Sequence, residues 1–486
     1  MNNPKYNKII MLILGYILLW AVIPSLFLQG MFTDSADNIS WTTIPLVDLL
    51  GTFKHPALGA WVLKFALKIT PTSLSAILLL SASCILITYF YIYKLGREFL
   101  PKEKVLFAIL FTSTLYYLNV RSLQYNQNII MLPFWSAAVF YTYKSINTNL
   151  RKYWVYLGIV CGLGMLAKYE IAVIILVLAI YLIFNYKKSY NANPLIAAAI
   201  GLFIFSPNLV WLIQHDFLPI NYMGMRADID APDGNNWLMH LINSLNYFKD
   251  QIGLLIYPII LAALFGKLGK FKINKDNKFS LMAGFAPFIL VFLISFLFGI
   301  KIPAEWSYPF YLFTTLAFIQ VCNIEVTPKR LNIVIGFVIF VHVCIFSVYF
   351  ITMFCSHKIS SINIPAEAIG KQTAKYWHEK VPNKKLEFVI GDNAALNGYI
   401  PAFTNDKPEP LFEYSFIDSP HLSKQEIEQN GAIGILEGCP TEIPNAIKDA
   451  FPNNKISNIQ CYSADTVNTI HPQPYKYSAY VIYPSS

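Results

Sequence analysis

The feature that most constrains this chain is a series of apolar runs near twenty residues long, separated by short polar loops. A helix needs about twenty apolar residues to cross the roughly 30 Å of hydrocarbon in a bilayer. We therefore expect a mainly α, polytopic helical membrane protein. The sequence predicts about eleven spans, at 8–30, 73–93, 105–118, 128–143, 153–168, 171–186, 195–213, 251–266, 279–299, 305–322 and 332–354.

Composition agrees with a membrane protein and excludes two other classes. Of the 486 residues, 55% are hydrophobic and 13% charged, and the mean hydropathy is +0.47. A chain this apolar is not intrinsically disordered. The net charge of +9 does not indicate a nucleic-acid partner, because the Lys and Arg residues are dispersed between apolar runs instead of forming one basic face. The expected partners are membrane lipids.

The distribution of Lys and Arg predicts the orientation. Positive loops stay on the cytoplasmic side, and a cytoplasmic N-terminus places eighteen Lys and Arg residues inside and eight outside. No small-residue cleavage site follows the first run, so we expect a retained helix. Eleven spans then divide the chain into a transmembrane domain, 1–354, with outside loops at 31–72 and 214–250, and a domain outside the cytoplasm, 355–486.

The C-terminal segment changes character, with Lys, Glu, Asn and Pro among short apolar runs. Residues 366–380 have helical spacing, and residues 387–391 are typical of a buried strand followed by a glycine turn. We predict a small soluble α/β domain. Cys439 and Cys461 are the cysteines of this segment beyond the membrane edge, and the sequence is equally consistent with a disulfide and with two free thiols.

Polar side chains gather in the predicted outside loops. A lone carboxylate such as Asp34 is often only a solvated charge or a helix cap, and a Lys and Glu pair can be structural. Lys168, however, interrupts a nearly continuous apolar run from 153 to 186, where charges are costly and usually functional. The candidates are Asp34, Asp37, Lys54, His55, Lys168, His215, Arg226 and Glu305.

These residue types suit a lipid-phosphate substrate. Lys and Arg can hold a phosphate at the level of the headgroups, and a carboxylate can remove the proton of an acceptor hydroxyl. No phosphate-binding glycine motif of a nucleotide enzyme competes with this interpretation.

Six short segments carry a family resemblance. They are DSAD at 34–37, FKHPALGAW at 53–61, NQNIIMLPFW at 126–135, GLGMLAKY at 162–169, SPNLVW at 206–211 followed by His215, and EWSYP at 305–309. In this order the chain, over about residues 8–350, resembles the polyprenyl-phosphate-dependent membrane glycosyltransferases of the GT-C fold. The most similar branch includes protein mannosyltransferases and the sugar transferases of lipid A and the lipopolysaccharide core.

The resemblance implies an activity and a site. A sugar would move from a polyprenyl-phosphate donor to an envelope glycolipid, glycan or protein, at the periplasmic face of the bacterial inner membrane. Asp34 would be the catalytic acidic residue, with Asp37 as the second candidate. The substrate-binding candidates are Lys54, His55, Lys168, His215, Arg226 and Glu305.

Two departures from the family pattern concern cofactors and carboxylates. Some relatives have, before the His-Pro pair, an acidic residue that helps to bind a divalent metal, whereas this chain has Lys54. A divalent metal therefore remains an open possibility and no cofactor is expected with certainty. Asn128 stands where many relatives have an aspartate, which removes a second carboxylate.

Two other classes fit part of the pattern. A transporter or a flippase of a lipid-linked or small polar substrate would also be a helical bundle with polar residues, but carriers usually show an internal repeat, and the sequence contains none that we detect. A sensor or scaffold would use the C-terminal domain to bind a partner. Both are alternatives to the glycosyltransferase.

Overall fold

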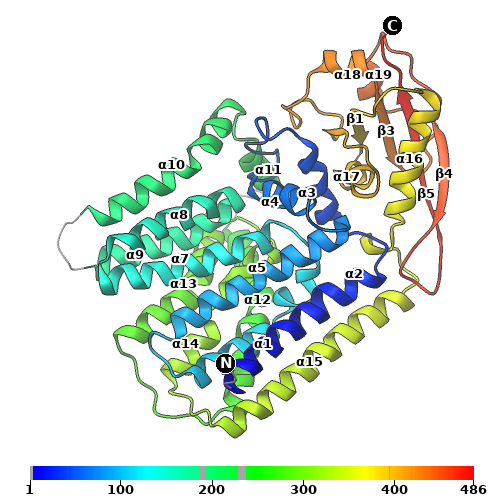
Figure 1. Cartoon of the computed structure of the whole chain (residues 1–486). Helices are drawn as coiled ribbons and strands as arrows, with labels where there is room; N and C mark the ends of the chain where they lie inside the picture. Colours follow the sequence, from blue (N-terminus) through cyan, green and yellow to red (C-terminus); the bar gives the residue numbers. More distant parts are fainter. Residues whose placement is uncertain (1–3, 187–191, 228–236, 393, 486) are drawn as a thin grey trace.

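The computed structural model describes residues 4–186, 192–227, 237–392 and 394–485. Helices fill the first three quarters of the chain, and a mixed sheet with its own helices lies at one end of the bundle (Figure 1). Three acidic residues of the expected loop 214–250, at positions 228, 230 and 233, lie outside the described residues.

The helical bundle follows the predicted apolar runs. Its elements are α1 (Pro4–Ile17), η1 (Leu18–Val22), α2 (Ile23–Phe27), α3 (Thr33–Thr43), α4 (Leu58–Ala66), α5 (Ser73–Gly96), α6 (Lys102–Ser113), η2 (Tyr116–Leu118), η3 (Val120–Leu123), α7 (Gln127–Thr148), α8 (Arg151–Ala167), η4 (Tyr169–Ile171), α9 (Ala172–Asn185), α10 (Asn193–Gln214), α11 (Leu218–Arg226), α12 (Trp237–Phe265), α13 (Lys275–Phe298), η5 (Ala304–Tyr311), α14 (Thr314–Val321) and α15 (Pro328–Cys355).

The prediction of a polytopic helical membrane protein is confirmed. Within the described ranges, six helices are long and apolar enough to cross a bilayer, and α6 with the η2 and η3 turns makes a seventh if this pair, bent by 94°, counts as one span. The number of eleven spans stays a prediction, because several of the expected runs form shorter helices.

Two runs predicted as single spans are broken in the structure. The run 105–118 ends its helix at Ser113, where the Asn119 amide donates to the carbonyls of Thr114 (3.0 Å) and Leu115 (2.8 Å). The run 305–322 begins as η5, which contains Pro309, and becomes α-helical only at α14. Proline lacks an amide donor and disfavours a regular helix, and such breaks are tolerated where protein surrounds the backbone.

Small residues bring two helices of the bundle into close contact. A Cβ atom on Gly158 of α8 would lie 2.5 Å from the Ala197 carbonyl oxygen of α10, and one on Gly162 would lie 2.8 Å from that of Gly201. Close packing through small residues is a usual way for membrane helices to associate. The short α8 is thereby fixed, and with it the reversal that carries Lys168.

The C-terminal region is an α/β unit, as predicted. It consists of η6 (Ser361–Asn363), α16 (Ala366–Lys380), β1 (Phe388–Gly391), α17 (Ala394–Phe403), β2 (Glu409–Phe412), α18 (Lys424–Asn430), β3 (Ala432–Glu437), α19 (Asn445–Ala450), β4 (Gln460–Asp465) and β5 (Pro474–Ile482). The predicted helix at 366–380 and the strand ending at Gly391 are both present. We call residues 361–485 the α/β region.

The five strands form one mixed sheet in the order β2-β1-β3-β5-β4. β1 runs parallel to β2 and β3, while β5 runs antiparallel to β3 and β4. Helices α16 and α17 supply the apolar residues that pack on one face, and α18 and α19 supply those on the other. Cys439 and Cys461 form a disulfide bond, which decides between the two alternatives that the sequence left open.

The α/β region rests directly on α3 of the bundle. A Cβ atom on Gly398 of α17 would lie 2.1 Å from the Ala36 carbonyl oxygen, so the two helices meet at a distance that only glycine allows. Phe53 contacts Phe412 of β2, with ring centroids 5.3 Å apart. The predicted loop 31–72 is thus held between the bundle and the sheet (Figure 1).

Candidate active site

Helix α3 carries the two predicted catalytic carboxylates and is unusually polar for a buried helix. Ser35, Asn38, Ser40 and Thr42 are all buried. Buried polar groups need partners, and α7 and the turn before it provide them. The Tyr125 amide donates to Ser35 Oγ (3.1 Å), and Gln127 Nε2 donates to Asn38 Oδ1 (2.9 Å). These bonds fix the rotation of α3 and the directions of its carboxylates.

Asp34 faces the start of α7. It lies in the first turn of α3, where the helix dipole favours a carboxylate. Asn126 Nδ2 donates to Asp34 Oδ2 at 3.1 Å, while Asn126 Oδ1 accepts from the Ile129 amide and caps α7. Asp34 is otherwise exposed. Its carboxylate is therefore oriented by an anchored amide and still accessible to a substrate.

Asp37 lies one turn further along α3 and pairs with Lys54. The distance from Lys54 Nζ to Asp37 Oδ2 is 3.3 Å, and the side chains are 15% and 16% exposed, respectively. Burial raises the pKa of Asp37 to about 6, although the Lys54 charge opposes this shift. Burial acts to lower the pKa of Lys54, but Asp37 outweighs it and the net shift is upward. The ammonium group also lies over the rings of Phe53 and Tyr222.

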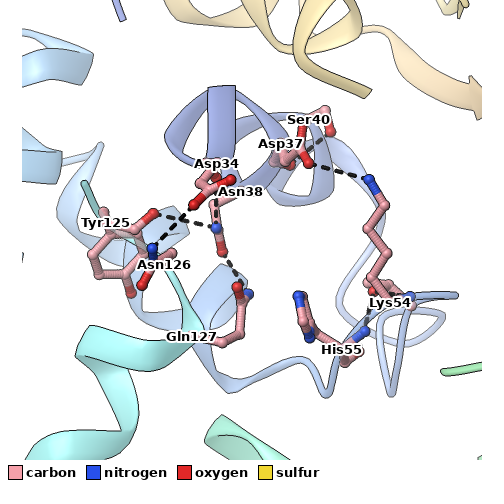
Figure 2. Close-up of polar contacts among 10 residues, drawn as sticks. Asp34, Asp37, Asn38, Ser40, Lys54, His55, Tyr125, Asn126 and Gln127 are labelled. Atoms are coloured by element: carbon pink, nitrogen blue, oxygen red, sulfur yellow. Dashed lines mark hydrogen bonds and ion pairs between the residues drawn. The ribbon is translucent and has the colours of Figure 1, made fainter. Parts of the chain in front are cut away.

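Figure 2 shows the two carboxylates on the same helix but turned to different partners, Asp34 to Asn126 and Asp37 to Lys54. His55 and Gln127 lie across from the helix, beneath the space between the carboxylates.

His55 lies in a tight loop next to these residues. The Thr52 amide donates to the His55 carbonyl (2.9 Å), and Gly51 and Pro56 form an antiparallel bridge. The His55 ring meets Trp41 edge to face at 5.8 Å. Burial, followed by the charges of Lys168 and Lys54, lowers the pKa of His55 well below its usual value. The imidazole is therefore neutral at pH 7, and it lies within electrostatic reach of both lysines.

Lys168 ends α8 and is held on several sides. Its Nζ donates to Asn128 Oδ1 (2.5 Å) and pairs with Glu170, and it lies 5.9 Å from the centre of the Trp306 ring. The Lys168 and Glu170 side chains are each 11% exposed. Burial raises the pKa of Glu170, and Lys168 opposes the shift. Asn128, which replaces an aspartate of the family pattern, thus serves as an acceptor for Lys168.

Arg226 and Glu305 form an ion pair at the margin of the site. Arg226 Nη2 lies 3.0 Å from Glu305 Oε1, and the side chains are 51% and 41% exposed. Glu305 is close enough to Glu170 for the two charges to interact. The structure therefore gathers seven of the eight predicted residues, from Asp34 through Lys54, His55 and Lys168 to this pair.

His215 is the predicted residue that the structure keeps apart. Its ring stacks on Trp211 at 4.4 Å, and Nδ1 lies 2.7 Å from the Trp211 carbonyl oxygen. Both contacts are within one helical turn at the end of α10. Such local contacts are typical of the end of a helix. They do not connect the His215 side chain to the carboxylates of α3.

Arg121 is a residue of the site that the sequence reasoning missed. It lies in η3, and its Nη1 donates to Gln124 Oε1 (3.2 Å), whereas its buried Nε has no hydrogen-bond partner among the described residues. The charge of Asp34 acts on Arg121. A buried guanidinium donor without a partner is typical of a place that an anion fills.

The residues at Asp37 do not fit a metal ion. Within the described part of the chain, no group of three or more His, Cys, Asp or Glu side chains is arranged to hold one. The carboxylate of Asp37 instead faces the ammonium of Lys54, a cation at the position where some relatives place an acidic metal ligand. We therefore assign no step to a metal.

A cavity of about 520 Å³ lies between this site and the α/β region, and both line it. The bundle side contributes Thr33, Asp37 and Lys54, and the α/β region contributes side chains that the sequence did not connect to the site. These include Tyr399, Glu413, Glu437 and Tyr475. They lie more than 350 residues along the chain from Asp37, and no local pattern marks them.

Comparison with known proteins agrees with the fold. Residues 54–211, which include Lys54, His55, Arg121 and Lys168, match the family described as dolichyl-phosphate-mannose-protein mannosyltransferase. No curated protein sequence matches the chain.

Two similar solved structures cover nearly the whole chain. ArnT from Cupriavidus metallidurans bound to undecaprenyl phosphate has a TM-score of 0.56 and 12% identity, over 99% of this chain and 98% of that one. The apo state of the same protein gives 0.54 and 12%, over 99% of both chains. The resemblance expected from the sequence is confirmed at the level of the GT-C fold.

Proposed function

We propose that this protein is an integral-membrane glycosyltransferase that moves a sugar from a polyprenyl-phosphate donor to an acceptor of the cell envelope. The observation that carries the proposal is the juxtaposition on α3: two carboxylates beside two cations, Lys54 and Arg121, at one end of an apolar bundle with a GT-C fold. The undecaprenyl phosphate bound to the similar ArnT structure supports the class of donor.

Each side chain has a role in this reaction. Asp34, oriented by Asn126, accepts the proton of the acceptor hydroxyl. The hydroxyl oxygen forms a bond to the anomeric carbon of the sugar as the bond from that carbon to the lipid-phosphate oxygen breaks. Arg121 and Lys54 stabilise the charge that develops on the leaving phosphate. Asp37 holds Lys54, and Lys168 contributes positive charge from the far side of His55.

The membrane arrangement follows from the same proposal. The protein lies in the bacterial inner membrane with a cytoplasmic N-terminus, and the site and the α/β region face the periplasm. Residues 1–354 form the transmembrane domain and residues 355–486 the periplasmic domain. The acceptor is a lipid A, lipopolysaccharide-core, glycan or protein group.

A transfer assay in detergent tests the proposal. Purified protein is given undecaprenyl-phosphoryl sugars carrying a radioactive label and an envelope glycolipid extract. We expect label in the acceptor fraction with the wild type, unchanged transfer with Asp48→Asn, an exposed carboxylate of the same loop, and loss of transfer with Asp34→Asn. Equal transfer by Asp34→Asn would contradict the assignment.

A carrier is the second candidate. The bend of 94° after α6 and the break between η5 and α14 place irregular backbone inside the bundle, as in many transporters. A carrier moves its substrate only between compartments, so it forms no glycosylated product in detergent. Product formation under these conditions separates the two classes.

A further inference from the structure

We propose that the cavity between α3 and the α/β region binds a hydroxyl-rich sugar ring without phosphate, and that Glu413 and Tyr399 are its specificity-determining contacts. This inference rests on the proposed function and deepens it. It assigns part of the substrate site to the α/β region, whereas the sequence placed every candidate residue in the bundle.

The size and position of the cavity fit such a ligand. Its volume of about 520 Å³ lies within the usual 300–1,000 Å³ of small-molecule sites. Asp37 and Lys54 form part of its wall, and Asp34 lies one turn earlier on the same helix. A ring in this cavity is therefore next to the carboxylate that the proposed reaction uses.

Tyr399 offers a hydroxyl group that lacks a partner. The residue is fully buried (0% exposed) on α17 and lines the cavity. Its hydroxyl makes no hydrogen bond within the described residues and is not among the fully buried polar atoms that lack a partner, so it is open to the cavity. A hydroxyl of a sugar ring in the cavity can therefore be its hydrogen-bond partner.

The backbone conformation of Glu413 also indicates a ligand site in the cavity. Glu413 directly follows strand β2 with a φ of 49°, and Tyr414 comes next with a φ of 61°. Two successive left-handed residues that are not glycine are costly, and such strain is concentrated at functional sites. The strained turn places the Glu413 carboxylate in the cavity wall, where its charge acts on both Asp37 and Lys54.

The charges of the cavity favour hydroxyl groups over phosphate. Its charged side chains are three carboxylates, Asp37, Glu413 and Glu437, and one lysine, Lys54, which pairs with Asp37. Glu437 accepts from the Tyr475 hydroxyl (3.2 Å), which leaves its other oxygen available. Carboxylates accept strong hydrogen bonds from hydroxyls and repel an anion. The sugar then lies in the cavity, and the phosphate lies at its edge, between Lys54 and Arg121.

The ring can come from the donor or from the acceptor, and kinetics distinguish the two. Tyr399→Phe and Glu413→Gln keep the size of the side chain, and Glu442→Gln, on an exposed residue of the α/β region, is the matched control. We expect each cavity variant to raise KM about tenfold for the substrate whose sugar lies in the cavity, and to leave KM for the other substrate unchanged. Unchanged KM values for both substrates would overturn the proposal.

A binding measurement separates this proposal from the proposed function. Thermal stabilisation in detergent is measured with undecaprenyl phosphate, with undecaprenyl-phosphate glucose and with lipid A. The cavity variants should lose stabilisation by a sugar-bearing ligand and keep that by undecaprenyl phosphate. Loss of undecaprenyl phosphate binding would overturn the proposal, since the cavity would then hold phosphate. A wild type that transfers no sugar, but whose variants show this selective loss, would overturn the proposed function alone.

Discussion

Lys54 and Lys168 both lie within electrostatic reach of His55, and their surroundings differ. Lys168 is bound by Glu170 and Asn128 and covered by Trp306, so its hydrogen-bonding capacity is used within the protein. Lys54 pairs with Asp37 and lines a cavity. The sequence predicted a substrate-binding role for both. The comparison teaches that Lys54 is available to a ligand, whereas Lys168 mainly holds the reversal between α8 and α9.

The largest expected difference between the two lysines is in stability. Lys168→Met leaves Glu170 buried without its cation, and loss of one partner of a buried pair costs about 3 kcal/mol or more. We expect the midpoint of thermal unfolding in detergent to fall by several degrees, and Lys54→Met to change it little. The double variant Lys168→Met with Glu170→Gln should recover part of the loss. An unchanged unfolding midpoint for Lys168→Met would contradict the expected difference in stability between the two variants.

In the kinetics, Lys54→Met should have the larger effect of the two lysine substitutions. Lys54→Met removes a cation beside the leaving phosphate, so kcat should fall about a hundredfold, as for other groups that stabilise transition-state charge. We expect this variant to remain folded, because Asp37 can be protonated and its pair with Lys54 is more exposed than the pair of Lys168 and Glu170. The measurement is steady-state sugar transfer, with Lys64→Met on α4 as the control. If Lys54→Met keeps its kcat, the leaving group does not contact Lys54.

The pair of Asp37 and Lys54 should also give the enzyme a pH dependence. Burial raises the pKa of Asp37 to about 6 from 3.8, so the protonated form is favoured in the folded state. Its contribution to stability is present below about pH 4 and is lost as the pH rises to about 6. The ion pair forms over the same interval, and kcat should increase with a midpoint near pH 6. The pH profile of kcat in Asp37→Asn should lack this midpoint. An unchanged profile in that variant would show that another group titrates near pH 6.

Metal removal is expected to have the smallest effect. Lys54 supplies a positive charge next to Asp37, so the site does not need a metal ion for that purpose. Protein treated with EDTA should transfer sugar within twofold of the untreated rate. A large loss that Mg²⁺ or Mn²⁺ restores would show that a cation acts here in addition to Lys54.

Much of the bundle could be predicted because a bilayer imposes a local rule on sequence. Most apolar runs became single helices, and Lys168 marked a reversal of the chain by interrupting such a run. The carboxylates of α3 could be predicted as site candidates because they are polar residues between two apolar runs. The breaks at Asn119 and Pro309 were missed, because hydropathy does not report backbone direction.

The other half of the site could not be predicted, because it depends on contacts between distant segments. Gly398 against Ala36 brings α17 onto α3, and this packing places Tyr399 and Glu413 near Asp37. Arg121 was counted among the outside charges, but its nearness to Asp34 depends on the turn after α6. The role of His215 stays a prediction: its position in a family segment suggested a ligand contact, and the contacts of its ring are with Trp211.

Single-turnover sugar transfer tests the central claim most directly, because it isolates the chemical step from binding and product release. Wild type and Asp34→Asn are each saturated with undecaprenyl-phosphoryl sugar and mixed with excess acceptor glycolipid. Loss of a general base lowers the rate by about 10²–10⁴-fold, and we predict a fall in this range with donor affinity within twofold of the wild type. A rate for Asp34→Asn within twofold of the wild type would contradict the claim that the carboxylate of α3 accepts the proton.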